Sequence, residues 1–215
     1  DILLLEISDH QLNDMYDFKT DISVLTNICP THLDYHGSYE VYKSVKKKIF
    51  NHHTNSDIAI LNAKNYDSLE LTKDILSTKY YFNNEDNYVN SQGIYINQEK
   101  VIDLEDIVLK GTHNYENILA MLMVMELLHV DFKYAISVLK EFKGVEHRIE
   151  FVRDYKGVSY YNDSKSTNPT ATITALKSFS GNIHLILGGM DRSQDFNDLK
   201  PYLSKIKKIY AIGEV

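Results

Sequence analysis

The stretch Gly157–Ser178, GVSYYNDSKSTNPTATITALKS, decides the fold class of this chain. Its first part, Gly157–Tyr161, is rich in residues that favour strands. A polar loop follows, and the spacing of apolar residues then predicts a helix over Pro169–Ser178. Asn168 is predicted to cap this helix, because proline is favoured at the first helical position. A strand, a polar turn and a helix in succession are typical of α/β proteins.

The same alternation extends along the chain in both directions and predicts a mostly parallel sheet covered by helices. The predicted strands are Ile2–Leu5, Ile22–Ile28, Ile58–Leu61, Lys79–Phe82, Gly93–Ile96, Gly157–Tyr161, Ile183–Leu187 and Lys208–Ile212. The predicted helices are Tyr39–Phe50, Ser68–Leu76, Asn114–Leu128, Lys133–Glu141, Pro169–Ser178 and Asn197–Lys205. A domain boundary is expected near Lys143-Gly144, which divides the chain into residues 1–144 and 145–215.

Composition narrows the class of protein further. Of the 215 residues 43% are hydrophobic and 25% are charged, which is typical of globular proteins and excludes disordered and collagen-like chains. The net charge of −7 argues against a nucleic-acid or anionic-membrane partner. No apolar run is long enough to span a membrane, and the single Cys29 fits a reducing cytoplasm. Because both ends lie in strand-like runs, we expect the chain to be part of a longer protein.

The residues that follow the first two predicted strands are candidate ligands. Glu6 closes the first strand and offers an oxygen ligand to Mg²⁺, although for Glu6 alone a solvated strand end is the favoured explanation. His32 and His36 follow the second strand four residues apart, a spacing that also occurs in zinc sites. Pro30 and Gly37 indicate a loop there instead of one helix face, so packing or hydrogen bonding remains an alternative role for these histidines.

One lysine of the helix predicted at residues 39–50 stands apart from its neighbours. The helical period places Tyr42, Val45 and Ile49 on one apolar face, and Lys46 falls within that face. A lysine on a buried face needs a partner or a chemical modification. The remaining lysines of the helix are predicted to point away from the apolar face: Lys43, Lys47 and Lys48.

Two further polar segments precede helices. Asn114 and Asn117 share one face at the start of a long apolar helix, where they could read the edge of a purine; Thr112 or Asn114 could instead be the N-cap. Lys165 precedes the helix that begins at Pro169, and a helix N-terminus beside a cation favours anions. Asp163 nearby could orient a metal or a ribose.

Six motifs occur in order along the chain: Glu6-Ile7-Ser8 with Gln11-Leu12; Asn27-Ile28 with His32-Leu33-Asp34-Tyr35-His36-Gly37; Tyr42 with Lys46 and Ile49; Gly111 with His113-Asn114, Asn117 and Ala120; His147-Arg148; and Asn162-Asp163-Ser164-Lys165-Ser166-Thr167-Asn168. Together they resemble the Mur ligases of peptidoglycan synthesis, and the stretch from Asn162 to Lys165 favours the members that add D-glutamate.

The resemblance implies part of a three-domain enzyme. Residues 1–144 would be the later part of a central ATPase domain, and residues 145–215 the first part of a Rossmann-like C-terminal domain. The implied reaction uses ATP and Mg²⁺ to join D-glutamate to UDP-N-acetylmuramoyl-L-alanine through an acyl phosphate, in a cytoplasmic monomer that serves cell-wall biogenesis, cell shape and cell division. The family's P-loop, a Gly-rich turn ending in Gly-Lys-Thr or Gly-Lys-Ser, is absent, so the chain alone is expected to be inactive.

The resemblance also implies roles for individual residues, with Lys46, His32 and Lys165 as the catalytic ones. Glu6 and His32 would bind Mg²⁺ together with Lys46, whose amine would be carbamylated. The implied ATP contacts are Asn114, Asn117, Arg148 and Asp163. Lys165, Thr167 and Arg192 would handle D-glutamate and the acyl phosphate, and Ser8 and Gln11 would face the muramoyl substrate.

The sequence departs from the family pattern at several positions. Asp9 and His10 stand where the family usually has Ser and Phe, Thr31 where Asp is frequent, and Arg192 where some members have Lys. Three alternative functions stay open: another Mur or folylpolyglutamate-type ligase, a noncatalytic nucleotide-binding module, and a metal hydrolase based on the nine histidines.

Overall fold

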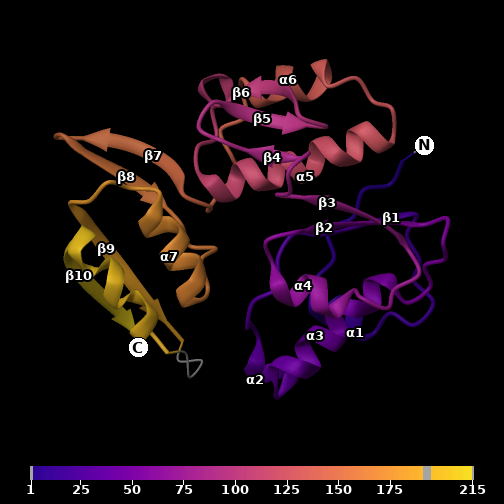
Figure 1. Ribbon diagram of the computed structural model, residues 1–215. Helices are drawn as coiled ribbons and strands as arrows, with labels where there is room; N and C mark the ends of the chain where they lie inside the picture. Colours follow the sequence, from indigo (N-terminus) through magenta and orange to yellow (C-terminus); the bar gives the residue numbers. More distant parts are fainter. Residues whose placement is uncertain (1, 191–194, 215) are drawn as a thin grey trace. The chain divides into compact units, whose positions relative to one another are not determined.

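The computed structural model describes residues 2–190 and 195–214, in two compact units (Figure 1). Unit 1 comprises Asp1–Ile107 and Asn114–Lys140, and unit 2 comprises Val108–His113 and Glu141–Val215. Among the described residues no helix is long and apolar enough to cross a membrane.

A three-stranded parallel sheet forms the centre of unit 1. Its order is β1 (Ile22–Leu25), β2 (Ile58–Asn62) and β3 (Thr78–Phe82). Strand β2 lies in the middle, and the side chains of Ala59, Ile60 and Leu61 are completely buried. A continuous apolar run is typical of a strand that is covered on both faces.

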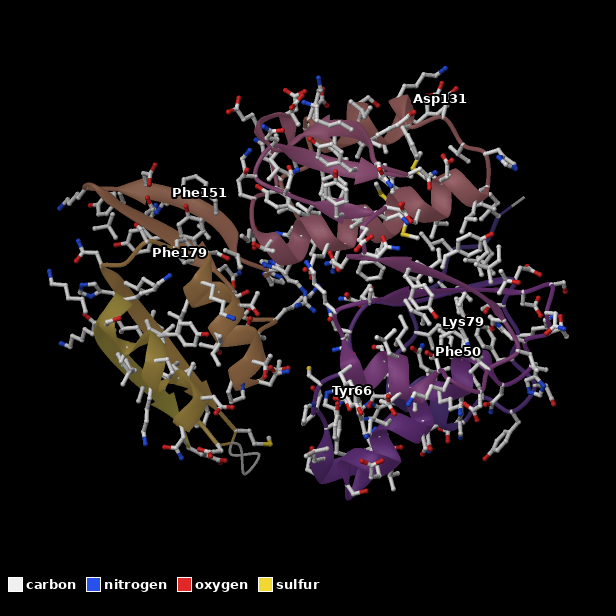
Figure 2. All side chains as sticks on the ribbon, viewed as in Figure 1. Phe50, Tyr66, Lys79, Asp131, Phe151 and Phe179 are labelled. Atoms are coloured by element: carbon white, nitrogen blue, oxygen red, sulfur yellow. The ribbon has the colours of Figure 1, made fainter. Side chains whose placement is uncertain are left out.

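Short helices pack beside this sheet. They are α1 (Asp9–Asn13), α2 (Leu33–His36), α3 (Tyr39–Lys47) with a 3-10 turn at Lys48–Phe50, and α4 (Tyr66–Leu71). Tyr42 of α3 and Phe50 of the 3-10 turn pack in one cluster with Leu25, Ala59 and Leu61 of the sheet, and Figure 2 labels Phe50 within this unit. Burial of this apolar face fixes α3 against the sheet.

The remainder of unit 1 is an antiparallel sheet followed by two helices. The sheet consists of β4 (Tyr88–Val89), β5 (Gly93–Ile96) and β6 (Glu99–Asp103), with a 3-10 turn at Leu104–Asp106. The helices are α5 (Thr112–Leu127), whose first two residues belong to unit 2, and α6 (Lys133–Leu139).

Unit 2 combines a hairpin, a helix and a parallel strand pair. The hairpin is β7 (Glu150–Tyr155) with β8 (Val158–Asn162), the helix is α7 (Pro169–Lys177), and β9 (Ile183–Gly189) pairs in parallel with β10 (Ile206–Gly213). As predicted, Asn168 caps α7 by accepting a hydrogen bond from the Ala171 amide at 2.8 Å, and Pro169 takes the first helical position. A 3-10 helix at Asn197–Lys205 precedes β10.

Several predictions differ from the structure, among them the helix predicted at Ser68–Leu76, which spans Tyr66–Leu71. Ile2–Leu5 is not a buried strand: its side chains are exposed, from 51% for Leu5 to 88% for Leu4, and no described strand pairs with it. Helix α5 begins at Thr112, so neither Thr112 nor Asn114 is its N-cap. Residues 197–205 wind as a 3-10 helix and not an α-helix, in agreement with Pro201 in their interior.

Candidate active site

A buried carboxylate, histidines and a lysine gather beyond the carboxyl end of β1. Asp9 comes from α1, His32 lies in the loop between β1 and α2, His36 ends α2, and Lys46 lies on α3. The carboxyl edge of a parallel sheet is where α/β proteins place their ligands. This edge of unit 1 is therefore the candidate active site.

Asp9 is the centre of this cluster. It is only 3% exposed, and its Oδ2 lies 2.7 Å from His36 Nε2 and 2.9 Å from His32 Nδ1. Burial by itself raises the pKa of Asp9, but the hydrogen bonds from His36 and His32 outweigh it and lower the pKa to about 2. The carboxylate is therefore ionised near neutral pH and can only accept hydrogen bonds, which both imidazoles donate.

His32 has a strained backbone and one ring nitrogen that Asp9 leaves available. Its φ of 53° lies in the left-handed region, which residues with a Cβ rarely adopt. Such strain is found preferentially at functional sites. Because Nδ1 donates to Asp9, Nε2 is the nitrogen that can face a cation.

Lys46 points toward the same carboxylate. Its Nζ lies 3.9 Å from Asp9 Oδ1, and its side chain is 20% exposed. Lys43 is no more exposed than Lys46: its side chain is 18% exposed and pairs with Glu40 and Asp67. Helix α3 is covered on more than one side, so the position of its apolar face in the sequence did not indicate that Lys43 is covered. Lys46 differs from Lys43 in its proximity to Asp9, whereas the two lysines are buried to a similar extent.

The other lysines of this segment also have partners. Lys47 pairs with Asp74 of the segment after α4, and its side chain is 32% exposed. Lys48 Nζ donates to the backbone oxygen of Asn13 at 2.7 Å and lies over the ring of Tyr16. Lys48 thus contacts the end of α1 and does not simply point to solvent.

The predicted residues around α1 do not join the Asp9 cluster. Ser8 is the N-cap of α1 and forms a capping box with Gln11: the Gln11 amide donates to Ser8 Oγ at 3.2 Å, and the Ser8 amide donates to Gln11 Oε1 at 2.9 Å. Both side chains are exposed while they hold the helix start. Glu6 is exposed ahead of the helix and is not part of the group of potential metal ligands that Asp9 forms.

A row of asparagines across the strand ends was not predicted. Asn62 Nδ2, at the end of β2, donates to Asn27 Oδ1 at 3.1 Å, and Asn83 Nδ2 donates to Asn62 Oδ1 at 3.0 Å. Asn65 adds a hydrogen bond to the Ile28 oxygen at 3.1 Å. The sequence feature that could have predicted this row is an asparagine at or near the end of each strand. Together they fix the loop that carries His32.

In unit 2, Asp163 connects its own loop to the segment around Ile149. Its Oδ1 accepts from the Ile149 amide at 3.0 Å, and its Oδ2 accepts from Ser166 Oγ. The charges of Asp163 and Arg148 both act on His113, whose pKa is lowered mainly by burial. Unit 2 thus brings together Arg148 and Asp163, both predicted to contact ATP, with His113, which sequence reasoning had only placed in a motif.

Four of the remaining predicted residues lie in the loop before α7 and in α5. Lys165 is exposed ahead of α7, with its amide bound to the His147 oxygen at 3.1 Å, and Thr167 is exposed in the same loop. Asn117 is exposed and Asn114 half-buried in α5, where they belong to unit 1. Arg192 lies outside the described residues.

The folds and these two clusters define a class of protein. It consists of α/β units in which polar groups follow the carboxyl ends of strands and precede helix N-termini. Such an arrangement is suited to anionic and nucleotide ligands. The chain matches the Mur ligase middle domain over residues 1–125 and the Mur ligase, glutamate ligase domain over residues 147–215. It belongs to the Mur ligase family.

Relatives cover nearly the whole chain. It is 42% identical over 218 residues to the UDP-N-acetylmuramoylalanine–D-glutamate ligase of a Geobacillus species, a match that spans 99% of the chain and 48% of that protein. The enzyme of the same name from Macrococcus caseolyticus is 38% identical over 100% of the chain and 49% of its own length. The chain spans about half the length of the curated relatives it matches.

Solved structures support the same fold. MurF from Acinetobacter baumannii aligns with a TM-score of 0.76 at 18% identity, over 91% of this chain and 47% of its own. MurF ligase from Thermotoga maritima in complex with ADP aligns with a TM-score of 0.67 at 24% identity, over 90% of this chain and 49% of its own.

Proposed function

We propose that this chain is part of an ATP-dependent amide ligase that adds D-glutamate to UDP-N-acetylmuramoyl-L-alanine. The observation that carries the proposal is the identity of 42% over 99% of the chain to an enzyme of that name. In this reaction the alanyl carboxylate is phosphorylated by ATP, the amine of D-glutamate attacks the acyl phosphate, and phosphate leaves. The ADP bound to the MurF neighbour from Thermotoga maritima supports the use of ATP.

The cluster around Asp9 suits a divalent cation. Asp9 is a buried anion, His32 offers Nε2, and Lys46 lies 3.9 Å from the Asp9 carboxylate. Carbamylation would turn the Lys46 amine into an anionic oxygen ligand, and a second anion beside Asp9 needs a cation to balance it. Glu6, His32 and the carbamylated Lys46 would hold Mg²⁺, which would supply electrostatic stabilisation of the phosphate charge.

Residues of unit 2 also have roles in this proposal. We assign Arg148 and Asp163 to the nucleotide together with Asn114 and Asn117 of α5, and we assign Lys165 and Thr167 of the loop before α7 to D-glutamate and the acyl phosphate, together with Arg192. Ser8 and Gln11 would face the muramoyl substrate. In this proposal residues 1–144 form the central domain and residues 145–215 the C-terminal domain, in a cytoplasmic monomer.

The test measures phosphate release by a full-length ligase that carries this sequence. With ATP, Mg²⁺ and UDP-N-acetylmuramoyl-L-alanine, we expect release to depend on D-glutamate and to be absent with L-glutamate or D-alanyl-D-alanine. Release that another amino acid supports equally would indicate a different ligase. Nucleotide binding without any release would indicate a noncatalytic module.

A further inference from the structure

Asp9, His10 and His32 form a group with the composition of a transition-metal site. Their ligand atoms lie within 4.8 Å of one another. The Asp9 Oδ2 atom is 3.3 Å from His10 Nδ1 and 2.9 Å from His32 Nδ1. Ligands about 2.1 Å from one metal ion in tetrahedral geometry lie roughly 3.4 Å apart, so modest rotations of these rings are enough to enclose an ion.

The ligand types select the ion. Two imidazole nitrogens and one carboxylate oxygen favour Zn²⁺, Co²⁺ or Ni²⁺, whereas Mg²⁺ prefers oxygen ligands and water. We propose that Asp9, His10 and His32 bind a divalent ion of this late first-row class. Three protein ligands leave one position open for water or for a donor atom of a ligand.

Neighbouring side chains hold these ligands in place. His36 Nε2 donates to Asp9 Oδ2 at 2.7 Å, and the side chain of His36 is only 2% exposed. The rings of His10 and Tyr35 lie 4.3 Å apart, and those of His10 and His32 meet edge to face at 4.9 Å. A hydrogen-bonded outer partner is the usual support of a metal ligand, and His36 provides one for Asp9.

This site is distinct from the Mg²⁺ site of the proposed function, with which it shares only His32. Glu6 and Lys46 are not among its ligands, and the Lys46 ammonium faces the other oxygen of Asp9. Coordination through Nδ1 of neutral His32 moves the ring proton from Nδ1 to Nε2, with no net change in charge. An ion at this site therefore withdraws Nε2 from Mg²⁺.

The test titrates the 215-residue chain with Zn²⁺ by calorimetry and with Co²⁺ by visible absorption. We expect one ion per chain. Asp9→Ser and His10→Phe each remove a ligand and should weaken binding by more than the roughly 10- to 100-fold known for loss of a supporting outer group at metal sites. His10→Phe decides the question if Asp9→Ser fails to fold, because the His10 side chain is 46% exposed.

Matched controls distinguish this site from other donors. His52→Gln removes a histidine elsewhere in unit 1, and Cys29→Ser removes the only thiol; both should bind Zn²⁺ like the unaltered chain. Glu6→Gln should also leave Zn²⁺ binding intact. The proposal is overturned if the chain binds no Zn²⁺, if His10→Phe binds it as tightly as the unaltered chain, or if His52→Gln or Cys29→Ser abolishes binding.

Discussion

Asp9 stays ionised although it is buried, because two imidazoles donate hydrogen bonds to one of its oxygens and a lysine approaches the other. Three elements, α1, α2 and α3, therefore meet at one charge. A substitution that removes the Asp9 carboxylate leaves the donor of buried His36, and that of half-buried His32, without an acceptor, which costs more than the loss of one ordinary hydrogen bond.

Asp9→Asn should destabilise the chain by about 2 kcal/mol at pH 7, the value of a pKa shift from 3.8 to about 2. A lowered pKa in the folded state means that this stabilisation is complete above about pH 4 and is lost as the pH falls toward 2. Urea unfolding should therefore show a difference between the two proteins that shrinks across this interval. The exposed Asp17→Asn is the control. A difference that stays constant down to pH 2 would contradict a role for the ionised carboxylate.

Lys46→Ala should nearly abolish ligation in the full-length enzyme, and small carboxylic acids such as acetate should restore part of it by replacing the proposed carbamate. Lys47→Ala is the matched control, because Lys47 only pairs with Asp74 on the surface and such pairs contribute about 0–1 kcal/mol. Initial rates of phosphate release measure the activity of both variants and its recovery with added acid. Equal losses of activity in the two variants, or no rescue by any acid, would indicate that Lys46 contributes only general positive charge and not a carbamate.

At the scale of elements, continuous apolar runs and cap residues identified most of the fold. Strand β5 and the cap of α7 were predicted at the correct residues, because Gly93 punctuates the former and Asn168-Pro169 starts the latter. Strand β6 was missed, since Glu99 and Lys100 interrupt any apolar pattern and only pairing with β5 makes this segment a strand. Ile2–Leu5 shows the converse: an apolar run forms no strand without a partner.

The start of α7 depends on its cap. Asn168→Ala should lower the stability of this helix by about 1 kcal/mol, because the Ala171 amide loses its acceptor. Amide hydrogen exchange in the first turn should become faster, whereas Asn168→Asp should retain protection since aspartate caps equally well. Unchanged exchange in Asn168→Ala would show that the loop does not need this cap.

The loop before α7 also offers a test of Asp163. In the full-length ligase, Asp163→Asn should lower activity strongly and raise the KM for ATP if the carboxylate serves the nucleotide. Asparagine can still accept the hydrogen bond of the Ile149 amide, so the melting temperature should change by only a few degrees. Ser166→Ala is the control, because it removes the second hydrogen bond of Asp163 and keeps the charge. A large loss of stability with normal activity would make Asp163 a structural residue.

For the whole molecule, sequence motifs named candidate residues but not their contacts. Asp9 appeared only as a departure from the family pattern, yet it connects His32, His36 and Lys46. Contacts between segments far apart in sequence leave no local periodicity, so no helical or strand period could have indicated them. The roles assigned to Lys165 and Asn117 rest on residues of different units and stay predictions.

The 215-residue chain alone should form both units and still release no phosphate with ATP, UDP-N-acetylmuramoyl-L-alanine and D-glutamate. Its sequence contains no Gly-Lys-Thr or Gly-Lys-Ser, so it lacks the backbone cradle that holds the ATP phosphates in P-loop enzymes. Circular dichroism would verify folding, and a full-length ligase carrying the same residues is the positive control. Phosphate release by the chain that requires both substrates would mean that the residues of the two units suffice to bind and activate ATP.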